Sequence, residues 1–84
     1  MDWDQIVTVD FLRNLAEEYH AKTILVTKEV FDRLAVRVQP AQINYTPGHP
    51  PTIWITPYTE VTMSVSEEPK AVIDLTGEEI EVRE

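Results

Sequence analysis

The stretch TIWITPYTEVTMSVS, residues 52–66, has the most regular hydrophobic pattern in the chain, with a period of two residues. One set of alternate positions is apolar: Ile53, Ile55, Val61, Met63 and Val65. The other set is polar except for two aromatic residues: Trp54, Tyr58, Glu60, Thr62 and Ser64. Because successive side chains of a strand point to opposite faces, the first set is predicted to face a core and the second to face solvent. The aromatic residues on the solvent side are therefore the best indication of function.

Pro57 leaves two interpretations of this stretch open, because proline cannot donate a ladder hydrogen bond. The stretch could be one long edge strand that passes through Pro57. Alternatively, residues 56–60 form a loop between two strands, which would pair Ile55 with Val61 and Ile53 with Met63. In both interpretations Trp54 points away from the apolar face.

Tryptophan and tyrosine surrounded by hydroxyl-bearing residues are typical of the centre of a protein interface. We therefore predict a partner-binding face, and its candidate residues are Trp54, Tyr58, Thr52, Thr56, Thr62 and Tyr45. The alternative is that Trp54 is covered within the chain, either by the N-terminal segment around Trp3 or by the proline-rich loop near residue 50.

Two similar segments, VTVDFLRNL at residues 7–15 and VTKEVFDRL at residues 26–34, predict two helix starts. Thr8 and Thr27 are favourable N-caps, because their hydroxyl groups can accept a backbone N–H of the first turn. The apolar residues at N′ and N4 have the spacing of a hydrophobic staple: Val7 with Leu12, and Val26 with Phe31.

The first helix is expected over residues 9–20, with one apolar stripe made of Leu12, Leu15, Ala16 and Tyr19. It is expected to end at Lys22 and the β-rich residues that follow. Residues 23–27 are predicted to form a short central strand, and residues 28–34 a second, shorter helix. Residues 34–39 fit either a strand or a continuation of this helix to Val38, and Pro40 ends whichever forms.

Two turns are predicted in the second half of the chain. Pro47 and Gly48 fit the central positions of a type II turn, in which glycine supplies a positive φ. The segment AVIDLTGEEIEV, residues 71–82, predicts a hairpin around Thr76 and Gly77. That register pairs Ile73 with Ile80, Ala71 with Val82, and Asp74 with Glu79. Two carboxylates opposite each other repel, so we expect this face of the hairpin to be exposed to solvent or to contact a cation.

These elements predict one α+β domain over residues 1–84, because a chain of 84 residues is too short for two domains. Two short capped helices are expected to pack on one face of a small, mostly antiparallel sheet that ends in a C-terminal hairpin.

The charge of the chain indicates which partners to expect. The 15 acidic residues exceed the 7 basic ones, and the net charge is −8. No cluster of Lys and Arg is available for phosphate groups, so neither nucleic acid nor an anionic membrane is an expected partner. An acidic surface suits a basic protein partner or serves solubility. The candidate acidic contacts are Asp74, Glu78, Glu79 and Glu81.

The sequence offers little for catalysis. Cysteine is absent, and with only two glycines no phosphate-binding loop can be formed. His20 is expected to be a helix-end or partly buried histidine. His49 is expected in a proline-rich loop and has no His, Asp or Glu within ten residues on either side, so it is not expected to be a metal ligand or a catalytic base. We predict no metal, no cofactor and no enzymatic activity. A small enzyme is the third and least favoured alternative.

The N-terminal residues MDWDQIV are acidic where a signal peptide is basic, so the expected location is the cytoplasm. The segment ILVTKEVFDRL, residues 24–34, resembles segments of small tailed-phage proteins of unassigned role. The resemblance implies a phage accessory protein in the host cytoplasm or a component of the virion. We therefore expect a small acidic module that occupies a host or partner protein. The alternative is a structural subunit, either a homo-oligomer or a virion decoration protein.

Overall fold

The sheet is organised around a three-residue strand, β1 (Thr23–Leu25), which is parallel to both of its neighbours. A computed structural model of the chain describes residues 6–64 and 71–83. Ile24 of β1 lies between Val61 of β4 (Thr59–Thr62) and Ile73 of β5 (Val72–Asp74), and all three side chains are fully buried. The expectation of a central strand after the first helix is confirmed, although the strand ends at Leu25 because Thr27 caps the next helix.

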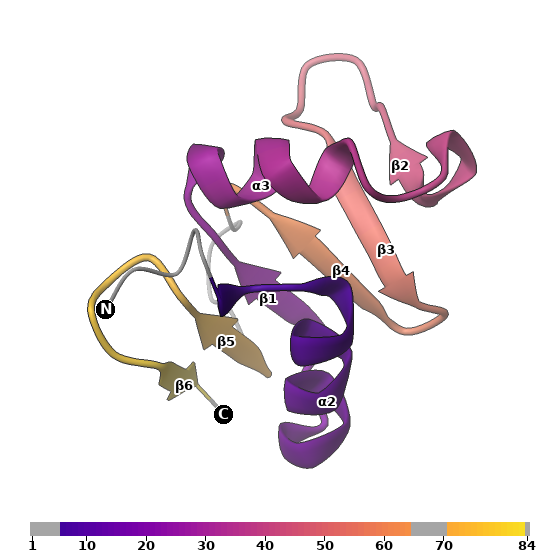
Figure 1. The fold of residues 1–84 in the computed structure, drawn as a ribbon. Helices are drawn as coiled ribbons and strands as arrows, with labels where there is room; N and C mark the ends of the chain where they lie inside the picture. The colour runs from indigo at the N-terminus through magenta and orange to yellow at the C-terminus, as the bar shows by residue number, and fades with distance from the viewer. Residues whose placement is uncertain (1–5, 65–70, 84) are drawn as a thin grey trace.

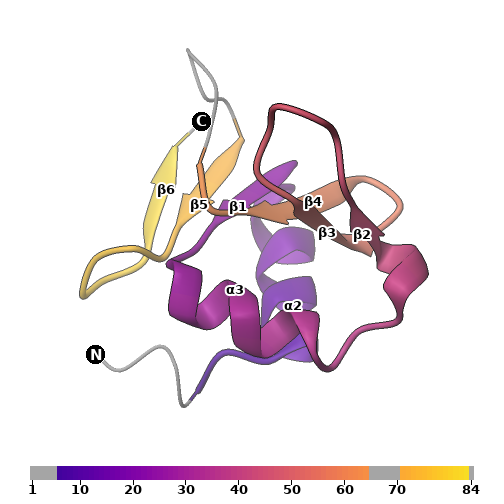
Figure 2. The same ribbon diagram turned by 90° about the horizontal axis from the view of Figure 1, so that it is seen from above.

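Within the described residues the sheet has six strands, in the order β2-β3-β4-β1-β5-β6. The outer strands are β2 (Ile43–Asn44), β3 (Thr52–Thr56) and β6 (Glu81–Arg83), and each pairs antiparallel with its neighbour. Both α-helices lie on the same face of this sheet (Figures 1 and 2). The predicted α+β fold, with two helices on one face of a mostly antiparallel sheet, is confirmed.

The two helices begin where the sequence predicts. In α2 (Val9–Tyr19) the Thr8 hydroxyl accepts the backbone N–H of Phe11 at 3.1 Å. In α3 (Lys28–Ala35) the Thr27 hydroxyl accepts the N–H of Val30 at 3.3 Å. The predicted staple residues are all buried in the common core: Val7, Leu12, Val26 and Phe31.

The helix ends differ from the prediction. His20 adopts the left-handed conformation, with φ 53°, and terminates α2 without a glycine. Tyr19 was expected in the apolar stripe but is exposed, because the last turn of α2 extends past the core. Residues 36–38 form neither of the two expected structures: α3 stops at Ala35, and a turn leads to the 3-10 helix η1 (Pro40–Gln42).

An exposed ion pair supports α3, where Nζ of Lys28 lies 2.7 Å from Oδ2 of Asp32. The hydrogen bond to Asp32, together with its negative charge, raises the pKa of Lys28. Because both side chains are exposed to solvent, this pair adds little to stability.

The β3–β4 hairpin confirms the two-strand interpretation of residues 52–62 but not its register. Ile53 lies opposite Val61 instead of Met63, and the connection is only the turn at Pro57 and Tyr58. A bulge between Trp54 and Thr56 accounts for one residue of this two-residue shift, and the shorter turn accounts for the other. The strand is extended back to Thr59, because the buried Thr59 hydroxyl donates a 2.8 Å hydrogen bond to the carbonyl of Ala21.

The β5–β6 hairpin also forms with a different register from the predicted one. Ile73 lies opposite Val82 and Asp74 opposite Glu81, so the connection is residues 75–80 and not two residues. The backbone leaves β5 early because the Asp74 carboxylate accepts the N–H of Thr76 at 2.9 Å. The shift is two residues, which preserves which side chains share a face.

The predicted type II turn is confirmed by its hydrogen bond and its glycine. The N–H of His49 donates to the carbonyl of Thr46 at 3.1 Å, and Gly48 has φ 83°. The loop that contains this turn, residues 45–51, rises from the face of the sheet that the helices do not cover (Figure 2).

We expect Thr27→Ala to lower the free energy of unfolding by about 1 kcal/mol, because the N–H of Val30 loses its acceptor at the start of α3. Urea denaturation followed by circular dichroism measures the loss. Thr27→Ser keeps the hydroxyl and is the matched control. An equal loss in both variants would show that the threonine methyl group matters, and not the cap.

Candidate functional site

The face of the sheet opposite the helices carries a continuous row of side chains that crosses five strands. Successive register partners along this row are Trp54, Glu60, Thr23, Val72 and Arg83. Directly paired residues of neighbouring strands point to the same side of a sheet. We call this side the open face, and it begins with an aromatic residue next to a carboxylate.

Trp54 points to the open face, as predicted, and 38% of its surface is exposed. Its neighbours in β3, Ile53 and Ile55, are buried on the helix side. The Trp54 carbonyl accepts a 3.2 Å hydrogen bond from Nε2 of Gln42, which fixes the strand against η1. The sequence leaves two ways of covering Trp54 open. Coverage by the segment around Trp3 lies outside the described residues. Coverage by the proline-rich loop is at most partial, because 38% of the Trp54 surface is exposed.

The other candidate residues of the predicted contact face do not form one surface. Thr62 is buried, and its hydroxyl donates to the carbonyl of Ser64 at 2.8 Å. Tyr45 is 73% exposed in the loop after β2, and Tyr58 is 82% exposed in the β3–β4 turn. The structure places Thr52 in one hollow and Thr56 and Tyr58 in another.

The first hollow lies on the open face beneath the 45–51 loop and has a volume of about 500 Å³. Its lining residues are polar except for Pro50: Asn44, Thr46, His49, Pro50, Thr52, Glu60 and Ser64. The Thr52 hydroxyl is the buried side-chain polar atom that has no hydrogen-bond partner in the described part of the chain. We call this cavity the loop hollow.

Sequence reasoning missed the loop hollow for a specific reason. Thr52 and Glu60 share the alternating pattern with Trp54, so their side of the sheet could be predicted. Asn44, Thr46 and His49 reach them only because the turn at Gly48 folds the loop back over the open face (Figure 2). The direction in which a loop folds is not encoded in a local pattern.

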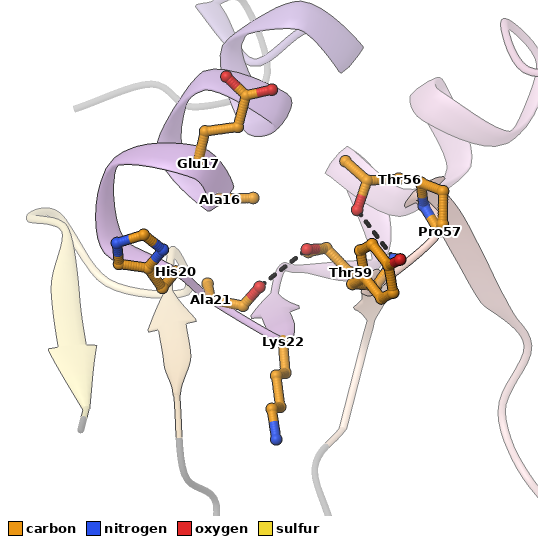
Figure 3. A pocket seen from close by; sticks show the side chains of 9 residues that line it. Ala16, Glu17, His20, Ala21, Lys22, Thr56, Pro57 and Thr59 are labelled. Carbon is orange, nitrogen blue, oxygen red and sulfur yellow. Dashed lines mark hydrogen bonds between the residues drawn. The ribbon is translucent and has the colours of Figure 1, made fainter.

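The second hollow, of about 530 Å³, lies between the end of α2 and the β3–β4 turn. Figure 3 shows Ala16, Ala21 and Thr59 between His20 on one side and Thr56 and Pro57 on the other. The N–H of Tyr58 donates to the Thr56 hydroxyl at 3.1 Å, so the turn that forms one wall is held in place. This hollow combines small side chains with an exposed tyrosine.

The predicted acidic contacts also separate into two kinds. Asp74 is 6% exposed and is already engaged: its carboxylate accepts from Nη2 of Arg83 at 3.0 Å and from the N–H of Thr76 at 2.9 Å. The sequence predicted that the acidic face of the C-terminal hairpin either is exposed to solvent or contacts a cation, and Arg83 is a cation that Asp74 contacts there. Glu78, Glu79 and Glu81 are exposed and remain accessible to a partner.

The site contains no visible arrangement for metal binding. Within residues 6–64 and 71–83, no group of three or more His, Asp or Glu side chains is placed to hold a metal ion. His49 lines the loop hollow and His20 lines the second hollow, so the two histidines do not share a site.

Among the residues that the structure describes, no helix has the length and hydrophobicity required to cross a membrane. No protein-family model matches the chain, and no curated protein or solved structure is significantly similar to it. The resemblance of residues 24–34 to phage proteins therefore stays a prediction.

We expect Asp74→Ala to lower the free energy of unfolding by about 2 kcal/mol, because it removes charge-assisted hydrogen bonds to Arg83 and Thr76. The partial exposure of Arg83 keeps the loss below that of a fully buried pair. Urea denaturation measures the effect, with the exposed Glu79→Ala as the control. Equal stability of the two variants would contradict a structural role for Asp74.

Proposed function

We propose that this chain is a non-enzymatic protein-binding module that occupies the surface of a partner through the open face around Trp54. The observation that carries the proposal is the position of Trp54, a large aromatic side chain held on an ordered strand and 38% exposed. Tryptophan is enriched among the residues that dominate binding energy, because it contributes a large contact area with few rotatable bonds.

The charge of the chain favours a basic partner. Glu60 stands beside Trp54 on the open face, and Glu78, Glu79 and Glu81 are exposed in the 75–80 connection and in β6. In a chain of net charge −8, this distribution attracts a positively charged surface and accelerates its association at low salt. A host protein of a phage is one such partner that the resemblance of residues 24–34 suggests.

The test is capture of a partner by the intact chain and by Trp54→Thr. Threonine keeps the strand preference of the position but removes the aromatic contact area. We expect Trp54→Thr to weaken binding of the captured partner by about 2 kcal/mol, measured by isothermal titration calorimetry. Thermal unfolding should show that the variant remains folded.

Val36→Ala is the matched control, because Val36 is also exposed but lies at the end of α3, away from the open face. It should bind the partner as the unaltered chain does. If Trp54→Thr and Val36→Ala bind equally well, the open face is not the contact surface.

A structural subunit that self-associates is the second candidate, and strand β6 supports it. β6 pairs with β5 on one side, and the described residues place no strand on its other side. Val82 of β6 is 37% exposed although it points to the helix side, and Ile80 beside it is 39% exposed. Antiparallel pairing of two β6 strands centred on Val82 would set Glu81 against Arg83 of the partner subunit, which is a self-complementary arrangement.

Sedimentation velocity over a range of concentrations tests this second candidate. If β6 mediates a dimer, Val82→Lys should produce a monomer, because two like charges would meet at the two-fold axis. Val36→Lys adds the same charge at the exposed end of α3, away from β6, and should leave the dimer intact. A chain that stays monomeric at the highest concentration would exclude the β6 dimer.

A further inference from the structure

We propose that the loop hollow binds the side chain of a lysine or arginine from the partner, with the cationic group against the Glu60 carboxylate. The inference rests on the proposed function and specifies which part of the open face recognises a basic partner. It is carried by the shape of the hollow, its charge, the buried Thr52 hydroxyl and the neighbouring Trp54.

The shape of the hollow suits one long side chain. Its volume of about 500 Å³ is within the range of sites that bind small ligands. One wall is the 45–51 loop, whose geometry is restricted by the hydrogen bond from His49 to Thr46 and by Pro50. The floor comes from β3 and β4, which belong to the sheet and are rigid. The hollow is therefore formed before a ligand arrives, which reduces the entropic cost of binding.

The charge of the hollow selects a cation. Among the described residues, Glu60 is the one carboxylate in the lining, and none of the described Lys or Arg residues contributes to it. No ion pair of Glu60 is found within the described residues. An anionic ligand would be repelled by Glu60. An ammonium or guanidinium group would form a charge-assisted hydrogen bond, which is about twice as strong as a neutral one.

The Thr52 hydroxyl is a second polar group beside the hollow. Thr52 lines the hollow, and its buried hydroxyl oxygen lacks a hydrogen-bond partner among the described residues. A buried hydroxyl without a partner is destabilising, and such a group in a folded protein requires an explanation. A cationic side chain that reaches Glu60 brings several N–H donors into the hollow, and rotation of the Thr52 side chain about χ1 would turn its oxygen toward one of them.

Trp54 extends the site at its rim. Trp54 and Glu60 are direct partners across β3 and β4 and point to the same face. The aliphatic stem of a lysine or arginine can pass over the indole ring while its charged end enters the hollow. An indole ring also attracts a cation placed over its face.

Other ligand classes fit less well. A metal ion requires three or more protein ligands in most sites, and the part of the chain that the structure describes offers His49 and Glu60 as the strong ligands of this hollow. A neutral polar ligand would leave the Glu60 charge without a counter-charge. The basic side chain is the ligand that satisfies both the carboxylate and the hydroxyl.

The test is a titration of the intact ¹⁵N-labelled chain, followed by heteronuclear NMR, with N-acetyl-arginine methylamide and N-acetyl-lysine methylamide at millimolar concentrations. N-acetyl-citrulline methylamide has nearly the shape of the arginine probe but no charge. We expect the charged probes to shift the amide signals of residues 44–46, 48, 49, 52 and 60, and citrulline to leave them unchanged. Added salt should weaken the binding.

Three variants locate the site. Glu60→Gln should weaken binding of the arginine probe at least about tenfold. Thr52→Val removes the hydroxyl while keeping a β-branched side chain, and should weaken binding about fivefold. Glu78→Gln makes the same charge change in the exposed connection and should bind within about twofold of the unaltered chain.

Equal shifts with the citrulline probe, undiminished binding by Glu60→Gln, or shifts outside the loop hollow would each overturn the inference. The same variants separate it from the proposed function. If Trp54→Thr loses the partner while Glu60→Gln retains it, the binding module stands and the loop hollow is not its cation site. If the arginine probe binds at Glu60 but Trp54→Thr does not affect partner capture, the site stands and the Trp54 contact surface fails.

Discussion

The parallel pairing of β1 with β4 and β5 is the constraint on which the remaining structure depends. Ile24 is fully buried between Val61 and Ile73, so a strand of three residues joins the β3–β4 and β5–β6 hairpins into one sheet. The ladder continues beyond the strand, because the N–H of Val26 donates to Thr62 at 2.9 Å and that of Leu75 to Leu25 at 2.8 Å. Parallel strands need a long connection between them. In this chain, α3 and the β2–β3 segment lie within the connection from β1 to β4.

Because α2 and α3 both pack on one face of the sheet, the side chains of the other face contact either solvent or another part of a protein. Part of the open face is closed internally, as in the pairing of Asp74 with Arg83 and of Thr62 with Ser64. The part around Trp54, Glu60 and Thr52 is not closed in this way. A one-sided sheet can carry such a surface without weakening the core, because the apolar side chains of the same strands point toward the helices.

The edges of the sheet differ in how they are protected from unwanted pairing. β2 has only two residues, Ile43 and Asn44, and is preceded by η1 and followed by the proline-rich loop, which limits the backbone that a neighbour could pair with. β6 is also short but lies at the far edge, where Val82 is left partly exposed by the helices. Short strands with charged residues such as Glu81 and Arg83 are a common protection of an edge.

The amino-acid sequence by itself determined the elements whose cause is local: the caps at Thr8 and Thr27, the turn at Gly48, and the alternation that places Trp54 opposite the core. Only the tertiary structure decided the registers of both hairpins, because the hydrogen bond of Thr59 with Ala21 and the ion pair of Asp74 with Arg83 join groups that meet after folding. It also decided that Thr52 lines one hollow whereas Thr56 and Tyr58 line another. The loop hollow exists only once β2, β3 and β4 have paired and the 45–51 loop has folded over them, and the direction in which that loop folds is not carried by a local pattern.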